Sequence, residues 1–178
     1  MTEVGDQPID GGAVVAQAVA LGRALERIGW MVTTAESCTG GMIACALTEV
    51  GGSSVWFERG FVTYSNDAKQ ACLGVASATL AEHGAVSEET ARQMARGALA
   101  HSRAQLALSV TGIAGPGGAV DGKPVGTVCF GWATATRVES RTRCFEGDRA
   151  AVRAQAALYA LREALRLLDS SGATTALA

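Results

Sequence analysis

Apolar residues near the start of the chain recur three and four positions apart, which is the spacing of a helix with one buried face. Glycines separate this run from shorter runs that are apolar throughout or rich in β-branched residues, which is typical of strands and turns. In the first half of the chain the pattern predicts a helix over 12–28 ended by Gly29, a strand over 30–35, a helix over 39–50 ended by Gly51, a strand over 55–65, and a short helix capped by Asn66 or Asp67 that carries Lys69.

The second half shows the same alternation of helical and strand patterns. It predicts two helices between 77 and 100, the second opened by Ser87, then a buried strand over 106–110, a glycine-rich loop to Pro124, two antiparallel strands over 126–136 and 141–145, and a helix capped by Asp148 that extends to about residue 168. Because strands alternate with helices, we expect an α/β fold. Its form should be a three-layer α/β/α sandwich with a mainly parallel mixed sheet and one antiparallel excursion.

Length and composition favour one compact domain. The chain has 178 residues, and we expect a single domain over 12–168, a flexible N-terminus over 1–11 and a flexible tail over 169–178. The apolar fraction is 48% and the charged fraction 18%, which argues against disorder. The net charge is −2 and no basic cluster is present, so nucleic acid is not an expected ligand.

Cysteine usage and targeting signals indicate the compartment. The five cysteines are odd in number and form no C-x-x-C pair, which is typical of a reducing compartment. The first residues are acidic and lack the features of a signal peptide, and the apolar run over 13–21 is too short to cross a bilayer. We therefore expect a cytoplasmic protein without a membrane partner.

The candidate chemistry centres on residues 34–41, where hydroxyls and glycines lie between a predicted strand and a predicted helix. The first N–H groups of a helix lack intrahelical partners and carry the positive end of its dipole, so they can hold a phosphate or a developing oxyanion. Ser37 lies where a nucleophile would be needed. An ordinary helix cap made by Ser37 or Thr39 is an equally simple interpretation of this segment.

Several familiar motifs fail on inspection. Gly117 to Lys123 imitates a phosphate-binding P-loop, but Pro124 replaces the required Ser or Thr and a strand follows. No G-x-G-x-x-G opens a helix after a strand, so a dinucleotide cofactor has no support. His83 and His101 lack the spacing of metal ligands, and we expect each at the surface or at a helix end. Any base for Ser37 must therefore be another residue.

The chain has only two lysines, Lys69 and Lys123. Lys69 follows the strand that ends near Tyr64, and parallel packing would bring the end of that strand beside Ser37. A lysine that acts as a base near pH 7 needs its pKa lowered by about three units, or about 4 kcal/mol, which burial can supply. The alternative for Lys69 is an ordinary solvated helix residue.

Two further segments could bind an anion. Thr111 and Gly112 end the buried strand, and the glycine-rich continuation can turn backbone N–H groups toward a phosphate. The alternative is a long surface loop. Arg149 follows the helix cap Asp148 and is either an exposed arginine or a fork beside a phosphate.

Six segments of the sequence resemble the CinA C-terminal family, the nicotinamide-nucleotide amidases. They run in the family's order: AESCTGG at 35–41, GSSVWFERGFVTYSN at 52–66, HGAVS at 83–87, TGIAGP at 111–116, KPVGT at 123–127 and FEGDR at 145–149. The resemblance implies deamidation of nicotinamide mononucleotide to nicotinate mononucleotide and ammonia, in pyridine-nucleotide salvage. It also implies that neither a metal nor a cofactor takes part, and that the chain self-associates as a dimer or a higher oligomer.

Residues and resemblance together give a hypothesis for the reaction. Ser37 attacks the carboxamide carbon, and Lys69 with help from Tyr64 removes the hydroxyl proton. Turn residues line the substrate and their N–H groups hold the oxyanion; the residues expected to do so are Glu36, Cys38, Thr39, Gly40 and Gly41. Thr111, Gly112 and Arg149 would hold the ribose phosphate.

Three other hypotheses stay open at this point. A directly activated water could replace the serine as the nucleophile. The chain could be a nucleotide-binding regulator of the same fold without activity, or an oligomerisation domain, although the latter leaves the hydroxyls, glycines and rare lysine at successive strand ends unexplained.

Overall fold

The computed structural model of the chain describes residues 11–170, and the remainder of the two predicted end segments lies outside the described residues. The elements follow in the order α1 (Gly11–Ile28), β1 (Val32–Glu36), α2 (Met42–Thr48), the 3₁₀ helix η1 (Ser53–Val55), β2 (Phe57–Val62), α3 (Asn66–Leu73), α4 (Ser77–His83), α5 (Glu88–Ala100), β3 (Leu106–Gly112), β4 (Thr127–Ala133), β5 (Val138–Cys144) and α6 (Arg149–Ser170).

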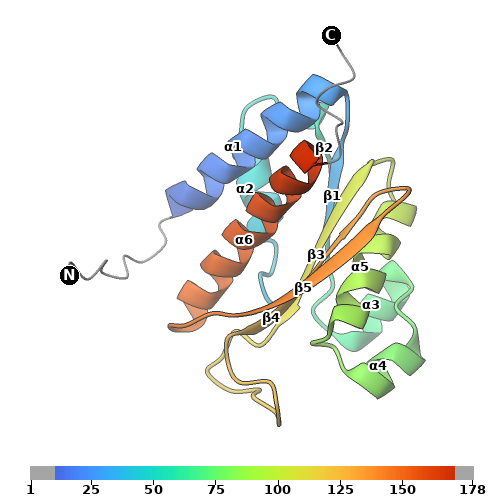
Figure 1. Cartoon of the computed structure of the whole chain (residues 1–178), viewed down its shortest axis with the longest axis vertical. Helices are drawn as coiled ribbons and strands as arrows, with labels where there is room; N and C mark the ends of the chain where they lie inside the picture. Colours follow the sequence, from blue (N-terminus) through green and yellow to red (C-terminus); the bar gives the residue numbers. More distant parts are fainter. Residues whose placement is uncertain (1–10, 171–178) are drawn as a thin grey trace, which may run out of the picture.

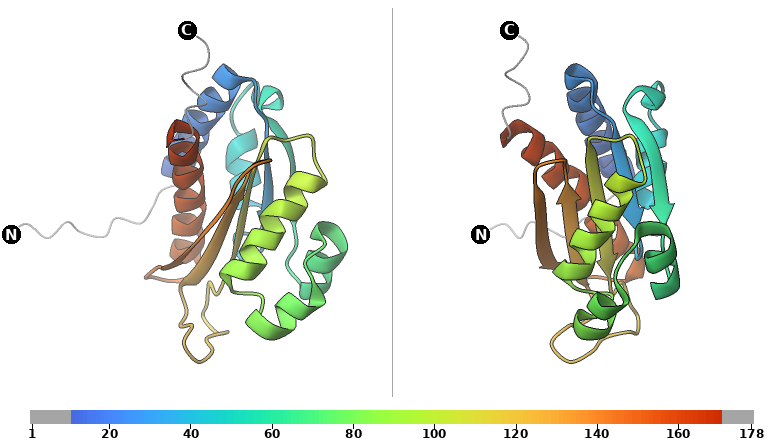
Figure 2. Two further views of the ribbon diagram at one scale, coloured as in Figure 1. Left: turned by 45° about the vertical axis from the view of Figure 1, so that its right-hand side comes forward. Right: turned by 90° about the vertical axis from the view of Figure 1, so that its right-hand side faces the viewer.

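The strands form one five-stranded sheet in the order β2-β1-β3-β4-β5, which the right-hand view of Figure 2 shows. β1 pairs in parallel with both β2 and β3, whereas β4 pairs antiparallel with β3 and with β5. Four strands therefore run in one direction and β4 alone runs in the other. The predicted mainly parallel mixed sheet with one antiparallel excursion is confirmed.

Helices cover both faces of the sheet. α1, α2 and α6 lie on one face, and α3, α4 and α5 lie on the other (Figures 1 and 2). The first interface is the larger, with bulky core residues such as Leu21, Leu108 and Phe130. The second is built mostly from small residues, among them Ala35, Ala95 and Ala98. The predicted three-layer sandwich is confirmed, and its small-residue layer brings α5 close to the strands that carry the candidate site.

Local chemistry explains most element boundaries. Gly29 ends α1 with a φ of 66°, and the Ser87 and Asp148 side chains accept hydrogen bonds from N–H groups in the first turns of α5 and α6, as predicted. The cap of α3 differs from the prediction, because Ser65 Oγ accepts from Ala68 N at 3.0 Å and Asn66 is already helical. α2 begins at Met42 rather than at residue 39, because Gly41 adopts a left-handed φ of 92°.

The close contact between α5 and α3 depends on one glycine. A Cβ atom at Gly97 would overlap the backbone carbonyl of Leu73, the last residue of α3. We expect Gly97→Ala to lower the free energy of unfolding by about 1 to 3 kcal/mol, since the overlap outweighs the better helix propensity of alanine. Chemical denaturation measures this difference.

Gly11→Ala is the matched control, because Gly11 is also helical and no atom lies within 4 Å of a Cβ built there. It should leave the unfolding free energy unchanged or slightly higher. A Gly97→Ala protein as stable as the parent would show that α5 and α3 can separate at no cost.

Candidate active site

The candidate site lies where the parallel strands end, at the lower end of the sheet in Figure 1. Ser37 directly follows β1, and its N–H donates to the Val110 carbonyl of β3 at 2.9 Å. Thr63 directly follows β2, and its N–H donates to the Glu36 carbonyl at 2.8 Å. β1 is the strand at which the chain order reverses, because its next two strands along the sequence lie on opposite sides of it. Ligand sites of open α/β sheets form at such a point.

Ser37 and Lys69 meet at this edge although they are thirty-two positions apart. Lys69 Nζ lies 3.0 Å from Ser37 Oγ and donates a second hydrogen bond to the Thr63 carbonyl at 2.9 Å. The exposed fraction is 1% for Lys69 and 8% for Ser37. The structure thus brings together the two side chains that sequence reasoning paired, and Lys69 is not the solvated helix residue of the alternative interpretation.

Burial lowers the pKa of Lys69 below its ordinary value of 10.5, and a smaller charge interaction with Cys38 opposes this shift. Within residues 11–170 no carboxylate forms an ion pair with the Lys69 ammonium. The environment therefore favours the neutral amine, which is the form that can accept a proton from a hydroxyl.

The Glu36 side chain holds the turn together. Its carboxylate is buried and accepts three backbone hydrogen bonds at the start of α2, from Gly41 at 3.1 Å, Ile43 at 3.0 Å and Ala44 at 2.9 Å. A carboxylate here satisfies orphan N–H groups and complements the helix dipole. The Glu36 carboxylate is therefore engaged within the fold, and its expected contact with the substrate stays a prediction.

The turn also leaves fewer oxyanion donors than expected. The N–H of Gly40 donates to the Ser37 carbonyl at 3.0 Å, and that of Gly41 is engaged by Glu36. The backbone N–H groups of Cys38 and Thr39 stabilise the Cys38 thiolate and so oppose part of the rise in its pKa. Within the described part of the turn, the N–H groups of Cys38 and Thr39 donate to no oxygen atom of the protein. Burial raises the pKa of the Cys38 thiol to about 12, so this thiol is no competing nucleophile.

Tyr64 and Arg149 meet at the rim of the site. Arg149 donates to the Tyr64 hydroxyl at 3.1 Å through Nη2 and to the Gly115 carbonyl at 2.9 Å through Nη1. Tyr64 has 62% of its surface exposed, and within the described part of the chain its hydroxyl forms no hydrogen bond to Ser37 or Lys69. The expected help from Tyr64 in proton transfer is therefore not supported by a hydrogen bond to either member of the pair, and it stays a prediction.

Thr111 and Gly112 are the last two residues of β3. Thr111 Oγ1 donates to the Ala85 carbonyl at 2.8 Å, and Thr111 is buried. A Cβ at Gly112 would lie within 2.9 Å of atoms of Thr127 and Val128, so glycine allows β3 and β4 to approach closely. The Thr111 hydroxyl donor is thus already used within the fold, whereas its oxygen can still accept.

Sequence reasoning missed two side chains that hold backbone segments distant in the sequence. Arg153 of α6 donates to the carbonyls of Cys38 at 3.1 Å and Thr39 at 2.8 Å. Lys123 donates to the carbonyls of His83, the last residue of α4, and of Val86, between α4 and α5. The available signal for Arg153 was its spacing of four from Arg149, which places both arginines on one face of a helix.

Two buried hydroxyls at the site have no hydrogen-bond partner in the described residues. They belong to Thr39 and Thr63, whose exposed fractions are 0% and 1%. Unpaired buried hydroxyls cost free energy, so they indicate where a bound molecule could be recognised.

A groove of about 890 Å³ lies behind the turn, between α1, α2 and the start of α6. Gly40, Gly41 and Arg153 line it, whereas Ser37 and Lys69 do not. The groove therefore borders the turn without including the Ser37–Lys69 pair.

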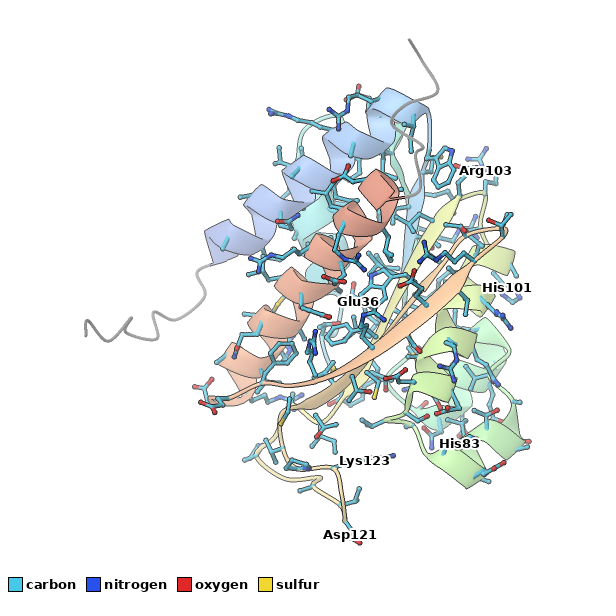
Figure 3. All side chains as sticks on the ribbon, viewed as in Figure 1. Glu36, His83, His101, Arg103, Asp121 and Lys123 are labelled. Atoms are coloured by element: carbon cyan, nitrogen blue, oxygen red, sulfur yellow. The ribbon has the colours of Figure 1, made fainter. Side chains whose placement is uncertain are left out.

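The two histidines lie away from this site, on the α4 and α5 side of the sheet, as Figure 3 shows beside Glu36. His83 is the last residue of α4 and His101 directly follows α5, so both stand at helix ends as expected. Residues 11–170 contain no group of three or more His, Cys, Asp or Glu side chains placed to hold a metal ion. The helices of this same region include none long and apolar enough to cross a membrane.

Comparison with known proteins finds one family throughout. The CinA C-terminal domain family matches residues 15–168. The nicotinamide-nucleotide amidohydrolase PncC of Escherichia coli (strain K12) is 59% identical over 144 residues, which cover 80% of this chain and 87% of that protein. The PncC protein of Pseudomonas putida is 51% identical over 154 residues, covering 86% of this chain and 96% of the relative.

Solved structures agree with the sequence comparison. The competence/damage inducible protein CihA from Agrobacterium tumefaciens has a TM-score of 0.84 and 47% identity, over 89% of this chain and 96% of that one. The CinA superfamily protein KP700603 from Klebsiella pneumoniae 700603 has a TM-score of 0.86 and 39% identity, over 88% of this chain and 98% of the other.

The role of Glu36 can be tested by stability. We expect Glu36→Gln to lower the free energy of unfolding by about 1 to 3 kcal/mol, because the amide group turns a donor toward backbone N–H groups that now share one acceptor oxygen. Glu49→Gln is the control, since Glu49 is exposed at the C-terminal end of α2 and its charge opposes the helix dipole there. Denaturant titration of the parent and both variants measures the free energies of unfolding. A Glu36→Gln protein as stable as the Glu49→Gln control would refute the structural role of Glu36.

Proposed function

Because the chain belongs to the CinA C-terminal domain family, we propose that it hydrolyses the carboxamide of nicotinamide mononucleotide to give nicotinate mononucleotide and ammonia. Relatives at 51% to 59% identity that carry the name nicotinamide-nucleotide amidohydrolase support the reaction. The observation that carries the mechanism is the buried Ser37–Lys69 hydrogen bond of 3.0 Å, since it joins a hydroxyl to an amine whose pKa is lowered.

In the first half of the reaction, Ser37 Oγ attacks the carboxamide carbon while neutral Lys69 takes the hydroxyl proton. The carbonyl oxygen becomes an oxyanion, for which the N–H groups of Cys38 and Thr39 are the donors at the turn. Lys69 then gives its proton to the departing nitrogen, the carbon–nitrogen bond breaks, and ammonia leaves an acyl-enzyme on Ser37.

In the second half, water attacks the acyl carbon and Lys69 accepts one of its protons. The bond between the carbon and Ser37 Oγ breaks, Lys69 returns the proton to the serine, and the carboxylate product leaves. The Thr63 carbonyl accepts a hydrogen bond from Lys69 and so keeps Nζ aimed at Ser37 through both halves.

The rim residues are suited to the rest of the substrate. Arg149, which donates to the Gly115 carbonyl in the loop after β3, offers a guanidinium for the phosphate, and Thr111 and Gly112 at the end of that strand are its expected partners in binding it. The exposed ring of Tyr64 can stack on the pyridine ring. The unpaired hydroxyls of Thr39 and Thr63 are further partners within reach of the turn.

The setting of the reaction follows from the same assignment. An amidase for this mononucleotide belongs to pyridine-nucleotide salvage. The five cysteines are all free thiols, which supports a reducing cytoplasm. Self-association as a dimer or a higher oligomer rests on the family resemblance.

Mutation of the pair tests the mechanism. We expect Ser37→Ala and Lys69→Met each to lower the rate of ammonia release from nicotinamide mononucleotide by about 10³-fold or more, because one removes the nucleophile and the other its base. Ser54→Ala is the control, since Ser54 is exposed on η1, and it should keep the parent rate. Near-normal release by a folded Ser37 or Lys69 variant would remove that residue from the mechanism.

Hydroxylamine separates covalent catalysis from a directly activated water. The parent protein should yield the hydroxamate of nicotinate mononucleotide, whereas a water mechanism forms no acyl-enzyme to trap. A parent protein that binds the mononucleotide and releases no ammonia would be the binding module of the alternative hypothesis.

The lowered pKa of Lys69 predicts two pH dependences. The rate should rise with pH through the Lys69 pKa of the folded protein, which lies below 10.5, because the base acts as the neutral amine. The free energy of unfolding should also rise with pH between that folded pKa and the unfolded value, since the unfolded chain binds the extra proton. Below the folded pKa the cost of burying the ammonium is fully present.

Rate and stability profiles of the parent and the Lys69→Met variant measure both effects. Methionine has no titrating group, so the stability rise over this window should disappear in the variant. A parent stability that falls with pH there, or an unchanged slope in the variant, would contradict the buried neutral amine.

A further inference from the structure

Arg153 is the residue of α6 that reaches the turn after β1. Its Nε donates to the Cys38 carbonyl at 3.1 Å and its Nη2 to the Thr39 carbonyl at 2.8 Å, across separations of 115 and 114 positions. Both bonds come from one planar guanidinium, which fixes the direction of the two carbonyls as well as their distance.

Fixing the Cys38 carbonyl also fixes an N–H group. The Cys38 carbonyl and the Thr39 N–H belong to the same peptide unit, and in a trans peptide they point in opposite directions. Because the guanidinium on α6 holds the Cys38 carbonyl toward that helix, the Thr39 N–H of the same peptide unit points away from α6. A positive charge on the carbonyl side also polarises the unit and makes its N–H a stronger donor.

The turn needs such an anchor because its own sequence gives little rigidity. Gly40 and Gly41 adopt left-handed φ angles of 60° and 92°. Gly41 is also the N-cap of α2, and as a glycine it offers no side chain to cap that helix. Glu36 holds the N–H groups from Gly41 onward, which lie beyond the Cys38–Thr39 peptide. Arg153 is the side chain that holds this peptide among the described residues.

Gly40 lies against the guanidinium. A Cβ atom built at Gly40 would lie 3.4 Å from Arg153 Nη2, in van der Waals contact with the hydrogen-bonded arginine, while the left-handed φ of 60° favours glycine there. Arg153 and the double glycine are thus parts of one arrangement.

We propose that Arg153 is a positioning residue of the amidase reaction, which sets the Thr39 N–H for the oxyanion through the Cys38 and Thr39 carbonyls. The inference rests on the proposed function. Arg153 does not touch the reacting atoms in this arrangement. Its loss should affect the transition state, where the oxyanion exists, more than the binding of the uncharged carboxamide.

The test compares Arg153→Met, Arg153→Lys and the control Arg162→Met, which removes an exposed arginine of the same helix. We expect kcat for ammonia release from nicotinamide mononucleotide to fall by about 10- to 100-fold in Arg153→Met, with KM changed less than about threefold. The lysine variant keeps the charge without the fork and should recover part of kcat. The pH midpoint of the rate should stay at the parent value, because Lys69 is not touched.

A second measurement reads the turn directly. The backbone amide proton of Thr39, followed by NMR, should shift upfield in Arg153→Met and less in Arg153→Lys, and should stay unchanged in Arg162→Met. Should Arg153→Met fail to fold, the lysine variant decides by the same two readouts.

The outcomes separate the two proposals. A parent protein without ammonia release overturns the proposed function itself. An active parent whose Arg153 variants keep kcat, or lose activity through KM alone, overturns the positioning role while leaving the amidase assignment in place.

Discussion

The site depends on an amine held out of water beside a hydroxyl. Lys69 is 1% exposed, and its hydrogen bonds go to a carbonyl and to Ser37 rather than to a carboxylate. Burying an ammonium without a counter-ion is costly, so the fold itself shifts the proton equilibrium of this side chain. A free lysine would be almost fully protonated at neutral pH, and the burial therefore accounts for how a chain without a nearby histidine can still offer a base.

Holding the amine there requires rigid neighbours on both sides. Ser65 caps α3 four residues before Lys69, and the close approach of α5 at Gly97 fixes the far end of the same helix. The turn that carries Ser37 is held on the other side by two side chains. Glu36 accepts a hydrogen bond from the Gly41 N–H, and Arg153 of α6 donates one to the Cys38 carbonyl. The end of β1 and the following turn place the hydroxyl, α3 places the amine, and the two side chains meet just beyond the strand ends.

The fold was predictable from sequence because it rests on local periodicity. Apolar spacing and glycine positions gave the strands, the helices and the single antiparallel strand, with errors of a few residues where turns replace regular structure, as at residues 37–41. The meeting of Ser37 and Lys69 was also predictable, since both follow parallel strands and such strands end at one edge of a sheet. The cap of α3 was misassigned by one residue because Ser, Asn and Asp all favour that position.

The rest of the site could not be predicted, because its contacts join distant parts of the chain. A carboxylate at a strand end has the same sequence signature whether it binds a ligand or caps the next helix, so the structural role of Glu36 was hidden. Tyr64 lies near Lys69 in sequence, yet its hydroxyl pairs with Arg149, eighty-five positions away. Arg153 resembles any other arginine of an amphipathic helix until its guanidinium is seen on the carbonyls of the turn.

These long-range hydrogen bonds have a consequence for synthesis. The turn after β1 is held by Arg153, which lies 115 positions after Cys38, and its rim is held by Arg149 of the same helix. Because a polypeptide is synthesised from its amino end, the serine and lysine segments are made before α6. A chain that stops short of α6 therefore lacks Arg149 and Arg153 and the hydrogen bonds that they donate to the rim and to the turn.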